Sequence, residues 1–183
     1  MVPYVTLYPE TRAALEADGI AAEYVDVSGS PSAYHDALEA VWRGGVGFTV
    51  VEQDIVVWPG ALKALWACEW DWCGYAYSIG THYGSYLGCV RFSDELVAGF
   101  PGAFDAIAAL PPDGTPRRYW GRLDTRLKSV LETAGHEMHV HWPLVGHLNP
   151  DKPDPIINCR CGRAVPYEIV RFGPPWRCGQ CDR

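Results

Sequence analysis

Hydrophobic and polar residues recur along the chain with two different periods, which predicts strands separated by helices. Six short stretches have the Val, Tyr and Phe content typical of strands. They are residues 4–7, 23–27, 46–51, 74–77, 86–92 and 138–142. Helices are predicted between several of these stretches from residues that favour helix ends. Pro9 and Gly19 bound the first helix, Ser30–Pro31 and Gly44 bound the second, and Pro59 begins the third.

The last long helix has the clearest periodicity. Its apolar residues recur at i, i+4, i+7, i+8 and i+11, and a glycine follows them. They are Leu123, Leu127, Val130, Leu131 and Ala134, followed by Gly135. Strands that alternate with helices indicate an α/β sandwich with a mainly parallel sheet. In such sheets ligands bind at the carboxyl ends of the strands.

Composition limits the class of protein. The chain has 183 residues, of which 48% are hydrophobic and 20% charged. These values predict an ordinary globular protein with one main domain and room for a small appendage. We expect a soluble protein of the cytoplasm with no membrane partner, because no apolar run approaches ~18 residues and the first residues do not resemble a leader. The net charge of −7 argues against a chain that coats nucleic acid electrostatically.

Within residues 1–150, basic residues are scarce and cluster in one segment. Arg117, Arg118, Arg122, Arg126 and Lys128 lie close together, beside Tyr119 and Trp120. A basic and aromatic patch on an acidic body suggests a local phosphate site. The face of a solvated helix explains the same pattern equally well.

The carboxyl-terminal cysteines have the spacing of a zinc ribbon. Cys159-x-Cys161 is followed, after a short insert, by Cys178-Gly-Gln-Cys181. Two close pairs of thiols on either side of such an insert can bind one tetrahedral zinc ion. We therefore expect a structural zinc ribbon at residues 156–183, after a proline-rich linker at 150–155; a redox pair or unligated thiols are the alternatives. Cys68, Cys73 and Cys89 lie in apolar stretches and are expected to be core residues.

An acidic pair follows the strand predicted at residues 46–51. Glu52 and Asp54 are separated by Gln53. Because burying unpaired carboxylates is costly, two of them at a strand end favour a divalent cation. A solvated turn is the alternative. The stretch of Gly and Tyr residues at 78–85 is predicted to be a mobile loop near a site.

The order of these motifs resembles a known family. An apolar strand, the Glu52-Gln-Asp54 motif, a proline-initiated helix, a strand at 87–92, the Trp120-Gly-Arg-Leu-Asp124 segment and an ending at His147 follow one another. Over residues 1–149 this resembles a small glycosyltransferase of the GT-A fold, of the type encoded by bacteriophages. The resemblance implies a GT-A-like, Rossmann-like, mainly parallel sheet flanked by helices.

The resemblance also implies roles for individual residues. Glu52 and Asp54 stand where the family has its D-x-D motif, which holds Mn²⁺ or Mg²⁺ against the donor diphosphate. Glu replaces the first Asp, so Asp54 is the firmer ligand. His147 would complete the metal shell, with His139 and His141 as competitors. Four further residues match as follows: Asp26 reads the nucleotide base, Thr6 and Tyr8 line the base or ribose pocket, and Asp124 is the catalytic base, unless it is a helix N-cap.

The expected activity is transfer of a sugar from a nucleotide sugar, such as a UDP-sugar, to a hydroxyl group. The favoured acceptor is 5-hydroxymethylcytosine in duplex DNA, with Arg117, Arg118, Trp120 and Arg122 as candidate contacts; a phage-encoded enzyme would act in the host cytoplasm. Protein, glycan and small-molecule acceptors are alternatives. Two other classes are a nucleotidyltransferase and a zinc-ribbon module that binds nucleic acid. The nucleotidyltransferase needs a glycine-rich basic loop, which residues 8–12 do not provide.

Overall fold

The computed structural model describes residues 1–79, 82–148, 156–158 and 164–166. The four cysteines predicted to form the zinc ribbon, Cys159, Cys161, Cys178 and Cys181, lie outside the described residues, as does the linker at 150–155. Within the predicted ribbon, strands β11 (Ile156–Asn158) and β12 (Ala164–Pro166) form an antiparallel pair.

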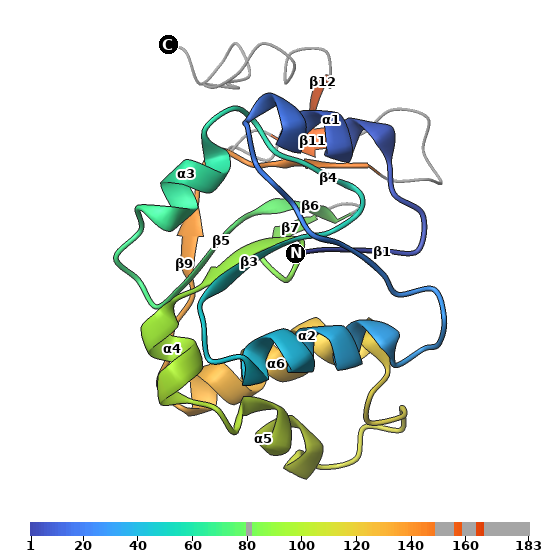
Figure 1. The fold of residues 1–183 in the computed structure, drawn as a ribbon, viewed down its shortest axis with the longest axis vertical. Coiled ribbons are helices and arrows are strands. Elements are labelled where there is room, and N and C mark those ends of the chain that lie inside the picture. Colours follow the sequence, from blue (N-terminus) through green and yellow to red (C-terminus); the bar gives the residue numbers. More distant parts are fainter. Residues whose placement is uncertain (80–81, 149–155, 159–163, 167–183) are drawn as a thin grey trace.

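The central sheet has four strands in the order β3, β8, β5 and β9 (Figure 1). These strands are β3 (Phe48–Val51), β8 (Cys89–Phe92), β5 (Trp72–Tyr75) and β9 (His139–His141). Strand β8 runs antiparallel to both of its neighbours, whereas β5 and β9 are parallel. Strands β3, β5 and β9 therefore share one direction, and β8 is reversed.

The α/β prediction agrees with this architecture, but the sheet is mixed rather than mainly parallel. A parallel return needs a long crossover, usually a helix. Between β5 and β8 the chain instead forms a hairpin of β6 (Tyr77–Ile79) and β7 (His82–Gly84). This hairpin occupies much of the segment expected to be an irregular loop, and the chain comes back antiparallel as β8.

The amino terminus adds two strands to the edge formed by β3. Strands β1 (Val2–Tyr4) and β2 (Tyr24–Asp26) are parallel. The terminal ammonium of Met1 donates a hydrogen bond to the carbonyl oxygen of Thr49 at 2.9 Å, and the N–H of Val51 donates to the carbonyl oxygen of Met1 at 3.1 Å. This pattern places β1 parallel to β3, so the carboxyl ends of β1, β2 and β3 lie together.

A small sheet stands beside these strand ends. Strand β4 (Ile55–Val56) pairs antiparallel with β10 (Gly146–His147), and His147 lies opposite Ile55. Because β4 directly follows the acidic motif, this pairing brings the end of the α/β domain back to Glu52 and Asp54.

Helices cover both faces of the sheet (Figure 1). Figure 1 shows α2 (Ala33–Arg43), α5 (Ala103–Ala109) and α6 (Leu123–Thr133) on one side and α1 (Pro9–Ala17) and α3 (Ala61–Trp66) on the other. Successive strand residues point to opposite faces. Accordingly, Val50 packs in the core with Trp42 of α2, whereas Val51 packs in a second core with Leu65 of α3.

The helices predicted from Pro9, from Ser30–Pro31, from Pro59 and from the stripe that begins at Leu123 are all present, within two or three residues. Gly135, with φ of +92°, follows the last of them. Helix α4 (Asp94–Gly99), helix α5 and the short 3₁₀ helix η1 (Trp120–Arg122) were not predicted. Among the described residues, no helix has the length and apolar character needed to cross a membrane.

Candidate functional site

A cavity of about 190 Å³ lies where β1, β2 and β3 end. Its walls are Pro3, Val5, Val27, Tyr34, Glu52, Gln53, Asp54 and Trp120. Val5, Val27 and Glu52 are the first residues after β1, β2 and β3, respectively. This is the edge at which sheets of this kind bind ligands.

Glu52 is half-buried and presents its carboxyl group on the wall of this cavity. Its Oε1 accepts a hydrogen bond from the hydroxyl of Tyr34 on α2 at 3.0 Å. Burial, together with the negative charges of Asp54 and Asp124, raises the pKa of Glu52 to about 7, although the hydrogen bond from Tyr34 and the nearby His147 oppose this shift. A carboxyl group in this environment is stabilised by a nearby positive charge.

Asp54 and His147 lie side by side. The Nε2 of His147 is 3.3 Å from Oδ2 of Asp54. The backbone fixes this arrangement, because the N–H of Leu148 donates to the carbonyl oxygen of Asp54 at 2.8 Å. The ring of Tyr77 packs edge-on against His147, with centroids 5.1 Å apart. The structure therefore brings together the acidic pair and the histidine that sequence reasoning placed in one metal shell.

Asp124 is the second residue of α6 and belongs to the same electrostatic environment. Its Oδ1 accepts a hydrogen bond from the N–H of Thr125 at 2.6 Å, and burial raises its pKa. Its charge raises the pKa of Tyr34, after the larger effects of burial and of Glu52. The helix begins after Arg122, so Asp124 is inside the first turn and is not the N-cap residue.

The residues expected at the base and ribose contribute less directly. Asp26 is exposed at the end of β2, and its Oδ1 accepts a hydrogen bond from the N–H of Ser28 at 2.8 Å; hydrogen bonds from Ser28 lower its pKa. Thr6 is exposed and Tyr8 is half-buried. None of these three is among the residues that line the cavity.

Gln53 is a site residue that sequence reasoning missed. Its side-chain oxygen accepts hydrogen bonds from the N–H groups of Val5 and Thr6, and its carbonyl oxygen accepts from the N–H of Tyr8 and the hydroxyl of Thr11. Gln53 thereby holds the turn after β1 against the acidic motif. Tyr34 was missed as well, because only the packing of α2 brings it to Glu52.

Much of the predicted basic patch is neutralised within the chain. The guanidinium of Arg118 donates to Asp36 at 2.7 Å and to Glu39 at 2.6 Å. Buried Arg126 pairs with Asp113, and Lys128 pairs with Glu132. The other residues predicted to contact DNA are less constrained. Arg117 donates to the carbonyl oxygen of Pro111 at 3.4 Å. Arg122 is exposed, and Trp120 is 54% exposed.

Two other groups of side chains have the donor atoms for a metal. His35, Asp36 and Glu39 place their ligand atoms within 4.8 Å of one another, but the guanidinium of Arg118 already supplies the positive charge there. Cys68, Cys73 and His141 form the second group. His139 and His141 were predicted to compete with His147, and the structure places them near Cys68 instead.

Comparisons with known proteins show similarity in fold alone. No protein-family model matches the chain, and no curated protein matches its sequence. The fold is similar to the crystal structure of A197 from STIV, with a TM-score of 0.58 and 9% sequence identity. The match covers 90% of this chain and 91% of that chain. It therefore extends over nearly the whole of both proteins.

Proposed function

We propose that this chain is a metal-dependent glycosyltransferase of the GT-A type that uses a nucleotide-sugar donor, with a UDP-sugar as the first candidate. One observation supports the proposal above the others. A cavity at the carboxyl ends of three strands combines apolar and aromatic walls with the acidic pair Glu52 and Asp54. The sequence resemblance implies that the donor diphosphate binds at this acidic pair, Glu52 and Asp54.

The cavity suits the base and ribose of a donor. Pro3, Val5 and Val27 offer apolar walls, and Tyr34 and Trp120 offer aromatic rings. Pockets that enclose a drug-sized ligand usually measure about 300–1,000 Å³. At about 190 Å³, this cavity would hold one part of the donor and leave the diphosphate beside Glu52 and Asp54.

The same acids fit a divalent cation. Carboxylate oxygens and one imidazole nitrogen are donors that Mn²⁺ accepts, and carboxylates also suit Mg²⁺. Asp54 and His147 would hold the ion, with Glu52 beside them. Burial and the charge of Asp54 raise the pKa of Glu52, and a cation there would oppose both effects. Bound at this place, the ion would stabilise the charge that develops on the diphosphate leaving group.

Asp124 is the proposed catalytic base. Its pKa is raised by burial, which makes the carboxylate a better proton acceptor near neutral pH. In an inverting reaction it would take the proton of the acceptor hydroxyl. A more open hollow of about 520 Å³ begins at Thr125, the next residue of α6, and includes Tyr86 and Lys128. We propose that the acceptor substrate binds in this hollow.

The first acceptor we propose is the hydroxymethyl group of 5-hydroxymethylcytosine in duplex DNA. Exposed Trp120 and Arg122 stand at the edge of the site and could stack on a base or contact a phosphate. Arg118 is less suited to phosphate because it is already bound to Asp36 and Glu39.

Release of nucleoside diphosphate from a panel of nucleotide sugars tests the proposal. We expect release from one donor with Mn²⁺, none with EDTA, and stimulation by duplex containing 5-hydroxymethylcytosine. Asp54→Asn should abolish the metal-dependent release. The matched control is Asp105→Asn, which alters an exposed aspartate paired with Arg43 on α2, and it should keep full activity.

Each contrary result has a separate meaning. Release without stimulation by DNA would retain the transferase and reject this acceptor. No release, with no donor-induced thermal stabilisation, would reject the transferase and favour a module that binds nucleic acid. Unchanged release by Asp54→Asn would reject the metal assignment.

A further inference from the structure

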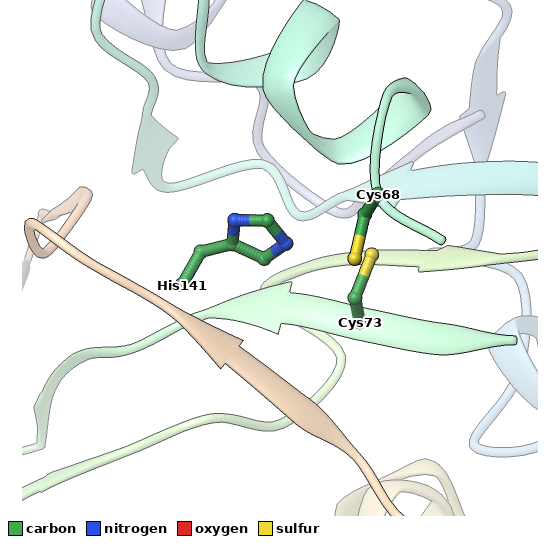
Figure 2. Close-up of side chains that lie close together, drawn as sticks. All are labelled: Cys68, Cys73 and His141. Carbon is green, nitrogen blue, oxygen red and sulfur yellow. The ribbon is translucent and has the colours of Figure 1, made fainter. Parts of the chain in front are cut away.

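Two cysteines and a histidine converge beside strands β5 and β9 (Figure 2). The ligand atoms of Cys68, Cys73 and His141 all lie within 4.8 Å of one another. Cys68 follows α3, Cys73 belongs to β5, and His141 belongs to β9. Three separate segments therefore supply one side chain each.

A second histidine lies on the same side of β9. Residues two apart in a strand face the same way, so His139 and His141 share a face, and their ring centroids are 4.6 Å apart. In the parallel pairing of β5 with β9, Cys73 lies opposite His139. The Sγ of Cys68 is 3.2 Å from Nδ1 of His139. Four potential ligands thus gather beside the edge strand.

His141 has a buried polar atom with no hydrogen-bond partner among the described residues. The Nε2 of His141 is buried and makes no hydrogen bond with any residue that the structure describes. Figure 2 shows the ring nitrogen farther from the backbone directed toward the two sulfur atoms. Buried polar atoms are normally satisfied, so an orphaned one needs an explanation.

The protonation of Cys73 and His141 bears on whether a cation could bind between them. Burial, followed by the neighbouring Cys68, raises the pKa of Cys73 to about 12. Burial, followed by the charge of His139, lowers the pKa of His141. His141 is therefore favoured as the neutral imidazole, which is the form that binds metals. A bound cation would instead favour the thiolate of Cys73 and release its proton.

We propose that Cys68, Cys73, His141 and His139 form a structural zinc site. Two thiolates and two imidazoles make a common tetrahedral set for zinc, with Zn–S near ~2.3 Å and Zn–N near ~2.0–2.1 Å. Ligand atoms around such an ion lie about 3.3–3.8 Å apart. The ligand atoms of Cys68, Cys73 and His141 lie within 4.8 Å of one another, and Nδ1 of His139 is 3.2 Å from the Sγ of Cys68, so all four side chains are near this spacing.

The surroundings hold the ligands in place. Nη1 of Arg91 donates to the carbonyl oxygens of Cys68 and Trp70, which fixes the loop between α3 and β5. The indole of Trp70 stacks on His139 with centroids 5.4 Å apart. Partners around the ligands orient them toward a metal. The ion would join this loop to β9, an edge strand of the four-stranded sheet.

Metal analysis of the full chain can distinguish this site from a zinc site formed by the carboxyl-terminal cysteines. The purified protein, loaded with ¹¹³Cd²⁺, should give a ¹¹³Cd resonance typical of two sulfur and two nitrogen ligands. A ribbon with four thiolates would give a different resonance, farther downfield. This measurement on the unaltered chain does not depend on whether any variant folds.

Matched variants assign the resonance. Cys73→Ala and His141→Gln should each lose one zinc per chain, measured by elemental mass spectrometry, together with the mixed resonance. Cys89→Ala, which removes another buried thiol with a raised pKa, should keep both. Absence of the mixed resonance in the unaltered chain would overturn the proposal. Retention of zinc by Cys73→Ala and His141→Gln, or a Cys68–Cys73 disulfide in protein isolated under reducing conditions, would also overturn it.

Discussion

The half-buried carboxyl group of Glu52 should make the metal-free protein less stable as the pH rises. Its pKa increases from 4.5 to about 7 on folding, so the folded state binds this proton more tightly than the unfolded state does. The stability contributed by the proton is complete below pH 4.5 and is lost between about pH 4.5 and 7. At about 1.4 kcal/mol per pH unit, the loss amounts to roughly 3 kcal/mol.

Replacing Glu52 with Gln removes the titratable carboxyl group and keeps the hydrogen bond with Tyr34. The amide oxygen of Gln can still accept the hydrogen bond that Tyr34 donates to Oε1. In EDTA, Glu52→Gln should match the unaltered protein near pH 4 and exceed its stability at pH 8 by up to ~3 kcal/mol. For a protein of this size that difference raises Tm by about 6–12 °C. Thermal unfolding across this pH range measures it.

Glu39→Gln is the control, because the sign should reverse. Partial burial opposes ionisation of Glu39, but hydrogen bonds from Arg43 and Arg118 outweigh it and keep the pKa below its ordinary value. This variant should therefore be less stable than the unaltered protein at pH 8, and the difference should shrink as Glu39 is protonated. If Glu52→Gln is no more stable at pH 8 and its curve stays parallel to that of the unaltered chain, the account of Glu52 is wrong.

Two further predictions concern contacts around the site. Gln53→Ala removes the acceptor for the N–H groups of Val5 and Thr6, so hydrogen exchange at these amides should quicken while exchange in α6 stays unchanged; equal protection in both proteins would contradict this role. Arg126→Met should lower the free energy of unfolding in urea by about 1–3 kcal/mol, because it leaves the carbonyl oxygens of Pro116 and Arg117 without their buried donor. A change below ~1 kcal/mol would contradict this account of Arg126.

Helices with a long apolar stripe or proline and glycine at their ends were predicted from the sequence, whereas short helices were not. Helix α4 had a local signal, since Ser93 accepts a hydrogen bond from the N–H of Leu96 and two acidic residues follow it. Its single buried pair, Leu96 and Val97, is too short a pattern to reveal a period. The direction of β8 was missed because periodicity identifies a strand but does not specify its orientation.

The acidic side of the site was predictable because its residues adjoin recognisable elements. Glu52 and Asp54 follow a strand, Asp124 begins a helix, and His147 ends the domain in the resemblance. Tyr34 could not be found this way, because on its own it is one of several partly apolar residues of α2. The same limit explains Arg118: local counting identified a basic patch, but its acidic partner Asp36 is 82 residues away.

The cysteines also show that local sequence does not reveal contacts between distant segments. Cys68 and Cys73 lie among apolar residues, and the next histidine along the chain is His82. A position in the core was therefore expected for both cysteines. Cys73 is indeed buried. What sequence reasoning could not supply is the pairing of β5 with β9, which brings His139 to Cys68 across 71 residues. Burial and metal binding are compatible for a thiol, because the same desolvation that disfavours an unpaired thiolate strengthens its attraction to a cation.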